Sequence, residues 1–389
     1  MRKFRNSLFL FLCVTTCFTS CKKETHNFNF SVDLLNTSDL IKEILEEIHQ
    51  RYADNITREK LEIGAINGML QVLDEYSSYI PNDEFNLYNQ SARGIFLGIG
   101  IEIKQIAEGL EIQSIIDDSP AAKAGLKHLD VITKINNKDI QNLTANQIST
   151  KLGNDLSMKL NLTIVRNKKE TIEVDIKKSI IQLRSVKTEF INDIAVIKIN
   201  YFNDSTIMDI SKAIKKIYKT KSIGVIIDLR NNPGGILDQA IGVADLFLVN
   251  KKIVEIKSHN STETKTIVSD DTDLLNNLPM AVLINHNTAS GAELLASALG
   301  ENKRAVIIGE KSYGKGTMQT IIPIPGHGAI KLTTAYFVSP NGNTINHKGI
   351  SPDIEITQQD NKDTALLRAL DLLRGIATLK NSEQSDIKS

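Results

Sequence analysis

The chain has 389 residues, 41% of them hydrophobic, and its 46 basic and 46 acidic side chains cancel to a formal net charge of zero. This length suits two or three globular domains, and no tail or patch of one charge sign dominates the sequence, so nothing points to nucleic acid. No nucleic-acid partner is therefore expected.

The first segment has the pattern of an export signal. Three basic residues within the first five positions precede a short apolar run, Leu8–Val14, and all three cysteines lie in or after that run, the last at Cys21. Such a run is too short to span a membrane as a helix but is typical of a secretory signal. The pattern resembles a bacterial lipoprotein signal. This implies cleavage before Cys21, a lipid on that cysteine as the only membrane contact, and a place in the cell envelope facing the periplasm; a secretory signal without lipid is the alternative.

Residues 22 to about 35 are polar and are expected to form a tether. Apolar residues at helical spacing in Asp39–Tyr52 and Thr57–Leu73 then predict a small helical region. From about Arg93 onward, short runs rich in isoleucine and valine alternate with turn residues, which predicts strands. One helix is expected to interrupt these strands, Ser119–Leu126, with Pro120 in its first turn.

A glycine-flanked stretch, LGIGI, opens the first of these strands. Neighbouring glycines let backbone N–H groups converge on an anion, and the strand Ile99–Ile103 offers an edge to which an extended peptide can add. Taken alone, the stretch is equally consistent with an ordinary turn before a strand. The residues expected to hold a peptide end are Leu97, Gly98, Ile99, Gly100 and Ile101.

Three further motifs follow in order: SPA from Ser119, AGL from Ala124 and DVI from Asp130. With them, residues 93–175 resemble a bacterial, circularly permuted PDZ domain. The resemblance implies a partner with a free, apolar polypeptide C-terminus. Leu129 stands where this family usually has glycine, so the turn before Asp130 is expected to differ in shape.

After about residue 185, strand-like runs alternate with helical segments, which predicts an α/β domain with a mostly parallel, buried sheet. A last periodic segment, Asp363–Leu379, predicts a closing helix. The expected fold class is multidomain, α+β and α/β. The expected parts are a signal peptide (1–20), a tether with the helical region (21–90), a PDZ domain (91–176), an α/β core (177–360) and a C-terminal helix and tail (361–389).

Ser290 stands between a predicted strand, Met280–Ile284, and a predicted helix, Ala292–Leu299. A serine at this junction is exposed at the C-terminal end of a strand, and the helix N-terminus stabilises negative charge nearby. Ser290 and Glu293 also match a capping box, in which the serine only caps the helix and contributes about 1 kcal/mol. From this segment alone, the cap is the favoured interpretation.

The stretch GEKSYGKGTMQ, residues 309–319, has three glycines in an aliphatic region. Its lysine, Lys315, can act as a general base only if its pKa falls from about 10.4 to near 7, which burial can cause. A solvated loop lysine is the alternative. Ser312 lies at S-x-x-K spacing from Lys315, the spacing at which a serine nucleophile and its lysine share one face of a helix. Gly314 and Gly316 would each destabilise such a helix by about 1 kcal/mol. No S-D-N or K-T-G motif follows, so we reject Ser312 as the partner of Lys315.

A third stretch, DLRNNPGG at residues 228–235, follows a predicted strand and could aim backbone N–H groups at an oxyanion, or be a plain turn. The chain resembles the C-terminal processing peptidases, or tail-specific proteases, because three motifs follow a PDZ-like module in the order DLRNNPGG, TASGAE and GEKSYGKGTMQ. LDEYSSYI (73–80) and SPNGNTINHKGISPD (339–353) extend the resemblance over about residues 60 to 355. Glu75 stands where the family usually has proline, and TASGAE replaces the commoner SASASE.

The resemblance implies an α/β serine-protease core of the ClpP/crotonase type with Ser290 as nucleophile, Lys315 as general base and Gln319 as the residue that orients the lysine. The implied oxyanion hole is formed by Gly291, Gly234 and Gly235. The implied function is a serine endopeptidase that recognises polypeptide C-termini through its PDZ domain and cleaves exported proteins through an acyl-enzyme, without metal or cofactor. A homo-oligomer is left open.

Lys315 and Gln319 would lie about 13 Å apart on an extended strand, at about 3.3 Å per residue, so we expect a bend between Gly314 and Gln319. A Ser-His-Asp protease would need a G-x-S-x-G or G-D-S-G-G motif, and neither occurs. His286 is therefore expected to cap or pack in its turn. A lipid-anchored PDZ scaffold with an inactive or substrate-gated protease domain is the alternative from another class.

Overall fold

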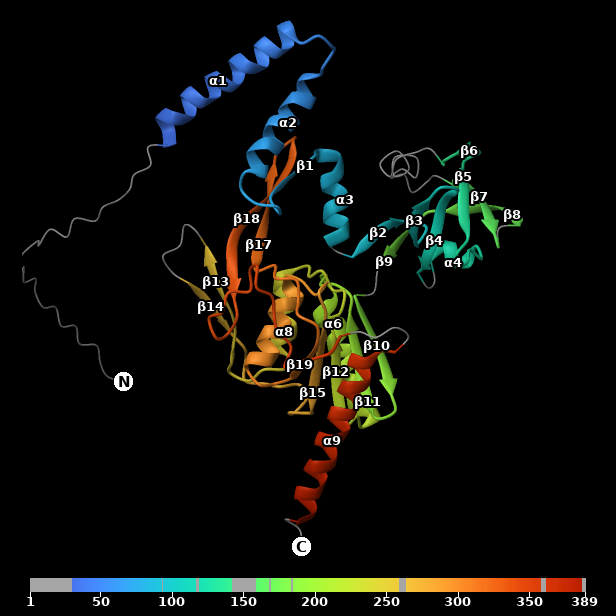
Figure 1. Ribbon diagram of the computed structural model, residues 1–389, viewed down its shortest axis with the longest axis vertical. Helices are drawn as coiled ribbons and strands as arrows, with labels where there is room; N and C mark the ends of the chain where they lie inside the picture. Colours follow the sequence, from blue (N-terminus) through green and yellow to red (C-terminus); the bar gives the residue numbers. More distant parts are fainter. Residues whose placement is uncertain are drawn as a thin grey trace, which may run out of the picture. The chain divides into compact units, whose positions relative to one another are not determined.

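The computed structural model describes residues 30–92, 94–116, 119–141, 159–167, 169–182, 185–258, 264–357 and 362–386 (Figure 1). The chain divides into two compact units, residues 1–66 and 67–389. The predicted signal peptide and Cys21 lie outside the described residues. Within the described ranges, none of the helices is both long and apolar enough to cross a membrane.

Two helices open the described part of the chain. The first begins at Phe30, inside the stretch expected to be a tether, and the second matches the predicted helix at Thr57–Leu73 closely. A short helix with Ser119 as its N-cap and Pro120 at its start lies where it was predicted. The described helices are α1 Phe30–Arg51, α2 Arg58–Gln71, α3 Asn82–Ala92, α4 Pro120–Lys123, α6 Thr206–Thr220, α7 Leu237–Asp245, α8 Gly291–Glu301 and α9 Thr364–Asp386.

The β-rich module is an antiparallel sheet in the order β3-β4-β5-β7-β8, with β6 paired to β5. Alternate residues of β7 (Leu160, Leu162 and Ile164) are fully buried, as expected for a strand with one face on a core. The strand β3 stands at the edge of the sheet, and β2 pairs with β9 in a separate ribbon. The strands are β2 Ile95–Gly98, β3 Ile101–Ile106, β4 Gly109–Ile115, β5 Val131–Ile135, β6 Lys138–Asp139, β7 Lys159–Arg166, β8 Glu170–Lys177 and β9 Ser179–Gln182.

The turn before Asp130 has a glycine-like backbone despite its leucine. Leu129 has φ 68°, in the left-handed region that side chains with a Cβ rarely adopt. Its side chain is exposed, while Asp130 is buried and pairs with Arg166 at 2.8 Å. The buried ion pair therefore holds the turn in a conformation that Leu129 does not favour by itself.

The α/β core is a six-stranded sheet in the order β10-β11-β12-β15-β16-β19. All pairings in it are parallel except that of β10 with β11, which agrees with the predicted mostly parallel sheet. Every residue of β12 and β15 is buried, as continuous aliphatic runs require when helices cover both faces. The strands are β10 Val186–Ile191, β11 Ile194–Ile199, β12 Gly224–Asp228, β15 Met280–Ile284, β16 Val306–Gly309 and β19 Ile354–Glu355.

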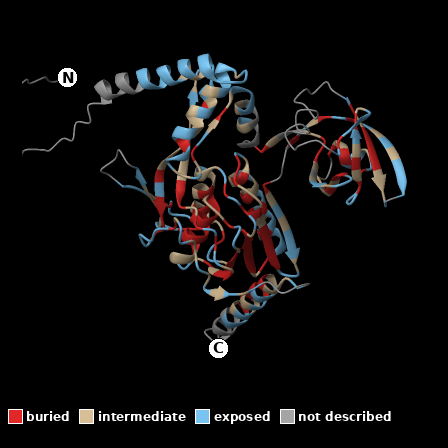
Figure 2. Ribbon diagram, turned by 45° about the horizontal axis from the view of Figure 1, so that its top comes forward, coloured by how far each residue is buried: buried red, intermediate tan, exposed pale blue. Residues whose placement is uncertain are grey.

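Alternate residues of these strands face two separate cores. Val225 and Val282 pack in the core that includes α6, α7 and α8, whereas Ile226 and Leu283 pack against α9. The two cores place α9 on the opposite face of the sheet from α6 and α8. Figure 2 shows buried residues both in the strands and in the central helices. The sheet is thus held from both sides, and its C-terminal edge stays open for a site.

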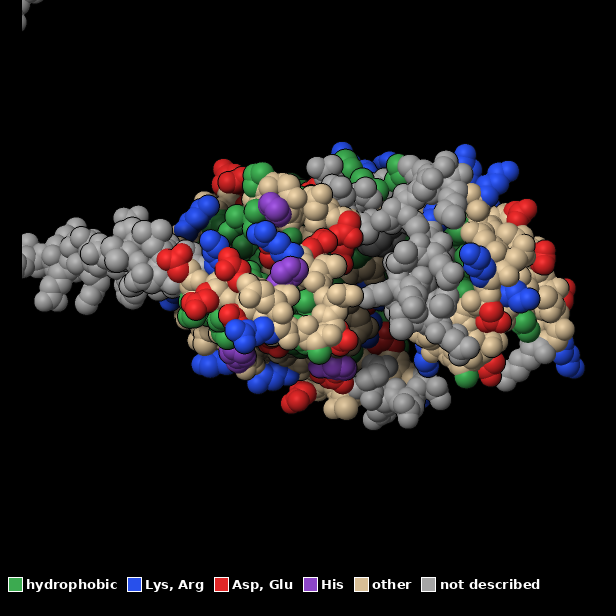
Figure 3. Space-filling view, turned by 90° about the horizontal axis from the view of Figure 1, so that it is seen from above, with side chains coloured by type: hydrophobic (Ala, Val, Ile, Leu, Met, Phe, Trp, Pro, Cys, Tyr) green, Lys and Arg blue, Asp and Glu red, His purple; other side chains and the backbone are tan. Residues whose placement is uncertain are grey.

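A second antiparallel sheet, in the order β1-β18-β13-β14 with β17 paired to β18, was not predicted. It joins residues far apart in sequence, because Ser78 of β1 pairs with Lys331 of β18. This pairing brings the turn before β1 close to the strand that follows Lys315. The strands are β1 Ser78–Ile80, β13 Lys252–Ser258, β14 Lys265–Val268, β17 Thr317–Ile324 and β18 Gly328–Val338. On the surface seen in Figure 3, basic and acidic side chains are interspersed.

Candidate active site

Ser290 occupies a strained turn at the start of α8. Its φ of 55° and ψ of −120° differ from the extended conformation of an ordinary N-cap residue. A non-glycine residue held in such a region costs about 1–3 kcal/mol and persists only where its surroundings enforce it. The predicted capping box is present in part, since the Ser290 N–H donates to Glu293 Oε2 at 2.9 Å. The strain goes beyond what a helix cap needs and is typical of a turn that presents a side chain.

The predicted glycine turn packs directly against this serine. Gly234 has φ 101°, and a Cβ on it would lie 2.7 Å from Ser290 Cβ and 3.0 Å from the nitrogen of Gly291. The N–H of Gly234 donates to Asn232 Oδ1 at 2.8 Å, so it is already used. Within the described residues, the N–H groups of Gly235 and Gly291 have no acceptor. The structure thus brings all three glycines to Ser290 but leaves two of their N–H groups available.

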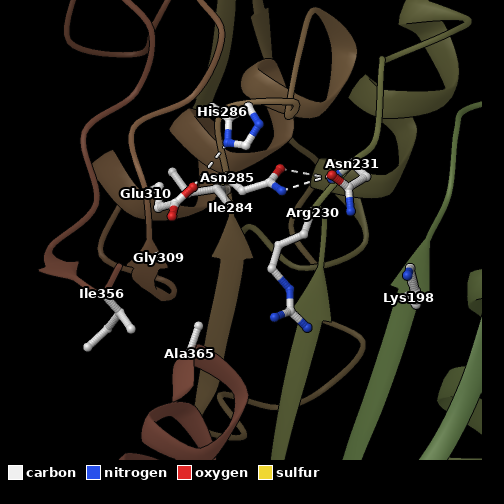
Figure 4. Close-up of a pocket in the computed structure, with 10 residues that line it drawn as sticks. All are labelled: Lys198, Arg230, Asn231, Ile284, Asn285, His286, Gly309, Glu310, Ile356 and Ala365. Carbon is white, nitrogen blue, oxygen red and sulfur yellow. Dashed lines mark hydrogen bonds and ion pairs between the residues drawn. The ribbon is translucent and has the colours of Figure 1, made fainter. Parts of the chain in front are cut away.

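Hydrogen bonds between asparagines join the loop after β12 to the loop that precedes Ser290. The N–H of Asn231 donates to Asn285 Oδ1, and Asn285 Nδ2 donates back to Asn231 Oδ1, each at 2.9 Å (Figure 4). A third hydrogen bond joins the same two loops, because the N–H of Ala289 donates to the carbonyl of Asn232 at 2.9 Å. The glycine turn and the serine turn are therefore fixed relative to each other at the C-terminal edge of the sheet.

The carboxylate of Glu293 connects Ser290 to the lysine loop. It is fully buried and accepts four hydrogen bonds. Its Oε1 accepts from Ser312 Oγ and the Gly314 N–H, both at 2.6 Å. Its Oε2 accepts from the N–H groups of Ser290 and Lys315 at 2.9 and 2.8 Å. The backbone nitrogens of Ser290 and Lys315 thus share one oxygen atom, although the two residues are far apart in sequence.

The four donors also decide the charge of Glu293. Burial raises the pKa of this carboxyl group, and the hydrogen bonds from Ser312, Gly314, Lys315 and Ser290 oppose the rise. Because every one of these contacts is a donor, only the ionised carboxylate, which has acceptors alone, satisfies them all.

Lys315 is half-buried, and its surroundings lower the pKa of its amine. Burial lowers its pKa, and the charge of Lys331 on β18 lowers it further, while Glu75, Asp74 and Glu293 oppose both effects. Its Nζ lies 4.5 Å from the centre of the Tyr76 ring. A cation–π contact of this kind favours the ammonium by about 0.5–2 kcal/mol, so it also opposes deprotonation. Burial is the larger effect, and the net shift is downward.

The glycines around Lys315 allow backbone to pack on backbone. A Cβ on Gly314 would lie 3.0 Å from the nitrogen of Gly349, and a Cβ on Gly316 would overlap Asn346. The His347 N–H donates to the Gly314 carbonyl at 2.8 Å, and the Gly316 N–H donates to Asn346 Oδ1 at 3.2 Å. The 339–353 segment therefore supports the lysine loop. Ser312 and Lys315 lie outside any helix, so they do not form a helical S-x-x-K pair.

Gln319 lies in β17, next to a register shift between Met318 and itself. The chain is irregular from Lys311 to Gly316, so the segment from Lys315 to Gln319 is not one straight strand. Gln319 Nε2 donates to Thr317 Oγ1 at 2.8 Å and to Thr333 Oγ1 at 3.2 Å. These two bonds orient the amide with its oxygen unengaged, and no hydrogen bond joins Gln319 to Lys315 among the described residues.

A cavity of about 370 Å³ opens at the same edge of the sheet (Figure 4). Arg230 and Lys198 line it, together with His286 and Glu310, whose side chains are hydrogen-bonded at 3.1 Å. Arg230 is already paired with Asp228 and Asp363, at 2.8 and 2.6 Å. Ser290, Lys315 and Gln319 do not line this cavity. His286 is exposed and contacts Glu310 at 3.1 Å rather than the serine, so the expectation that it packs in its turn is wrong.

In the β-rich module, the predicted peptide-binding residues join β2 to β3. Ile99 and Gly100 are buried, and a Cβ on Gly100 would collide with Ser119 at the start of α4. Gly98 and Ile101 flank them at the ends of β2 and β3, and the side chain of Leu97 lies outside the described residues. Within the described ranges, no group of three or more His, Cys, Asp or Glu side chains could hold a metal ion.

Two residues of this site were not singled out by the sequence. Glu293 was noted only as part of a capping box, and Tyr76 only as part of LDEYSSYI. Glu293 lies one turn after Ser290 in the predicted helix, and this position was a usable signal. A carboxylate buried there needs hydrogen bonds from several donors, which can come from loops distant in sequence. Nothing local to Tyr76 indicates that its ring lies against Lys315.

Comparisons with known proteins agree on one family. Residues 193–356 match peptidase family S41, and residues 98–177 match the PDZ domain. The chain is 38% identical over 321 residues to a carboxy-terminal-processing protease of Bartonella bacilliformis, which covers 81% of this chain and 74% of the relative. It is 33% identical over 329 residues to the carboxy-terminal processing protease CtpA of Bacillus subtilis, covering 83% and 69%. The fold is similar to that of a photosystem II D1 C-terminal processing protease, with a TM-score of 0.53 and 22% identity over 82% of this chain and 93% of that one.

The Glu293 contacts predict a large loss of stability for Glu293→Gln. An amide has one acceptor oxygen, so two of the four buried donors lose their partner, at about 1–3 kcal/mol each. We expect the free energy of unfolding, measured by urea denaturation, to fall by about 2 kcal/mol or more. Glu108→Gln, at an exposed turn, is the control and should change it by less than about 0.5 kcal/mol. Equal effects of the two substitutions would contradict the connecting role of Glu293.

Proposed function

Because this chain belongs to peptidase family S41, the carboxy-terminal-processing serine proteases, we propose that Ser290 is its nucleophile and Lys315 its general base. The observation that carries this proposal is the shared contact with Glu293 Oε2, which holds the backbones of Ser290 and Lys315 together. The strained turn at Ser290 and the lowered pKa of Lys315 support the same roles.

The reaction is an acyl transfer. Neutral Lys315 takes the proton of Ser290 Oγ, and the oxygen attacks the carbonyl carbon of the scissile peptide bond. The N–H groups of Gly235 and Gly291 stabilise the oxyanion, while Gly234 shapes the turn. The protonated lysine then gives its proton to the leaving amine. Water, deprotonated in turn by Lys315, hydrolyses the acyl-enzyme and restores the serine.

Gln319 is proposed to orient the lysine. Its Nε2 is engaged by two threonine hydroxyl groups, so its Oε1 is the atom that can accept a hydrogen bond from the Lys315 amine. In the arrangement described, Lys315 instead contacts the Tyr76 ring. The proposed mechanism requires the Lys315 amine to come within hydrogen-bond distance of both Ser290 Oγ and Gln319 Oε1.

Substrates are proposed to be exported polypeptides with free, apolar C-termini. The edge position of β3 supports addition of an extended peptide, and the glycines at 98 and 100 support a nest of N–H groups for the terminal carboxylate. We propose further that the mature chain starts at Cys21 and is held in the cell envelope by a lipid on that residue, facing the periplasm. The apolar run before Cys21 supports this.

Single substitutions test the two catalytic roles. With an unstructured polypeptide that ends in apolar residues, Ser290→Ala and Lys315→Ala should each lower the cleavage rate by about 10³-fold or more. Ser297→Ala, on the buried face of the same helix, is the control and should cleave as the wild type does. Cleavage by Ser290→Ala at the rate of the control would rule out Ser290 as the nucleophile, whereas absence of cleavage by the wild type would leave a PDZ scaffold as the better interpretation.

The pH dependence tests Lys315 as the base. Since a base must be neutral, kcat/KM should rise with pH, with a midpoint below the ordinary lysine pKa of about 10.4 because burial lowers the pKa of Lys315. Lys331→Met removes a repelling charge, so the pKa rises and the midpoint moves to higher pH. Glu75→Gln removes an attracting charge and moves it to lower pH. Shifts in the same direction would show that another group controls the profile.

Membrane fractionation tests the anchor. In a bacterial host that lipidates exported proteins, the wild type should sediment with membranes and incorporate labelled palmitate. Cys21→Ser should be found in the soluble envelope fraction without label, whereas Cys17→Ser should behave as the wild type. Labelling of Cys21→Ser would show that the lipid lies elsewhere.

A further inference from the structure

The turn Asp74–Ser77, between α2 and β1, is built around one carboxylate. Asp74 Oδ1 accepts from the N–H groups of Tyr76 and Ser77, both at 2.7 Å, and its Oδ2 accepts from Ser77 Oγ at 3.1 Å. Burial would raise the pKa of Asp74, but these hydrogen bonds and one from the Thr333 side chain outweigh burial and hold the pKa below its ordinary value. The shape of the turn therefore depends on an ionised carboxylate.

The same turn is hydrogen-bonded to β18 at the residue that contacts Gln319. The Thr333 N–H donates to Ser77 Oγ at 3.1 Å, across 256 positions of sequence. Gln319 pairs with Thr333 across β17 and β18, and its Nε2 donates to Thr333 Oγ1 at 3.2 Å. A hydroxyl group that accepts this bond still has its own proton to donate. Asp74 accepts that proton, so a hydrogen-bonded chain runs from the Gln319 amide through Thr333 to the Asp74 carboxylate.

Tyr76, in the middle of the turn, contacts the lysine loop at two places. Lys315 Nζ lies over its ring, 4.5 Å from the ring centre. Burial raises the pKa of the Tyr76 hydroxyl group, and hydrogen bonds with the side chains of Glu75 and Tyr313 raise it further, so the ring stays neutral. The face of a neutral aromatic ring attracts a cation. Tyr76 therefore limits where the Lys315 amine can lie.

We propose that the turn Asp74–Ser77 positions the general base and its glutamine. Tyr76 is a positioning residue that confines the Lys315 amine, and Asp74 is one that orients the Gln319 amide through the hydrogen-bonded chain. This inference rests on the proposed function, because it takes Lys315 as the base and Gln319 as the residue that orients it. The chain directs Gln319 Nε2 away from the lysine, which leaves Gln319 Oε1 to accept from the amine.

The groups around Lys315 decide the direction in which its pKa changes when the ring is removed. Burial and then the charge of Lys331 on β18 lower this pKa, and they are opposed by three carboxylates, Glu75, Asp74 and Glu293. The ring of Tyr76 acts with the carboxylates, because its face stabilises the ammonium. Removing the ring therefore lowers the pKa further. The midpoint of the rise of kcat/KM with pH moves to lower pH, because the base must be neutral.

Tyr76→Leu and Tyr76→Phe test the position of the lysine. Both lack the hydroxyl group, but only phenylalanine keeps an aromatic face. The kcat/KM midpoint should lie about 0.4–1.5 pH units lower in Tyr76→Leu than in Tyr76→Phe, the range that a cation–π contact implies. The plateau at high pH should also be about tenfold lower in Tyr76→Leu, because the amine is less confined.

A second tyrosine separates this effect from loss of stability. Tyr79→Leu, in β1, removes a ring whose hydroxyl group donates to the His327 carbonyl, and it should keep the wild-type midpoint. A variant that only unfolds in part would have a lower plateau and an unchanged midpoint, because the midpoint does not depend on the amount of active enzyme. Equal midpoints in Tyr76→Leu and Tyr76→Phe would refute the role of the ring.

A double-mutant cycle tests the hydrogen-bonded chain. Thr333→Val removes the hydroxyl group that joins Asp74 to Gln319, and it should lower kcat by about fivefold, the effect of one lost hydrogen bond. The double variant Thr333→Val/Gln319→Ala should be no slower than Gln319→Ala, because residues that act as a unit have non-additive effects. Thr320→Val, which removes an exposed hydroxyl contact with Thr334, is the control and should cleave as the wild type does. Multiplied effects in the double variant would refute a route through Gln319.

Acetylation of Lys315 gives a readout that does not depend on cleavage. In Ser290→Ala protein, the rate of acetylation by trace acetic anhydride, followed by mass spectrometry of the peptide that contains Lys315, reports the neutral fraction of the amine at each pH. The Lys315 pKa measured in this way should be lower with Tyr76→Leu than with Tyr76→Phe. Equal values overturn the inference even if Ser290 and Lys315 are catalytic. Conversely, cleavage by Ser290→Ala would refute the proposed nucleophile, and the acetylation result would still decide the position of the lysine.

Discussion

The buried carboxylate of Glu293 is the interaction on which the site depends. A carboxylate removed from water is costly unless donors replace its hydration, and here four donors do so. Two of them are the backbone N–H groups of the proposed nucleophile and base. If any of the four donors is removed, the buried carboxylate loses a hydrogen bond that replaces its hydration. The start of α8 and the loop from Ser312 to Lys315 therefore stabilise each other.

The strain at Ser290 follows from the same packing. The helix N-terminus, the Glu293 carboxylate and Gly234 enclose the serine backbone and keep it at a positive φ. The glycine turn is in turn held by Phe202 and by asparagines in the adjoining loops. Strain of this kind persists where several independent contacts enforce it. The parallel sheet supplies the rigid edge from which all these loops start.

Local patterns predicted the parts of the fold that local physics controls. The aliphatic runs of β12 and β15, the periodic helix α6 and the proline at the start of α4 were recognisable because burial and capping leave short-range signatures. The second sheet left no such signature. Its pairing of residues 78–80 with residues 329–331 depends on how the chain closes across some 250 positions, and β-pairing of this kind is not encoded within a window of neighbours.

The sequence alone determined which chemical groups are present: a serine at a strand-to-helix junction, a lysine among glycines in an aliphatic region, and a glycine pair after a strand. Tertiary structure decided how they are used. It engaged the Gly234 N–H with Asn232, stacked Lys315 on Tyr76, and turned the apparent helix cap at Glu293 into the bond between two loops. The reason is physical. A hydrogen bond or a desolvated charge depends on all the atoms within a few ångströms, and in a folded chain most of those atoms come from residues distant in sequence.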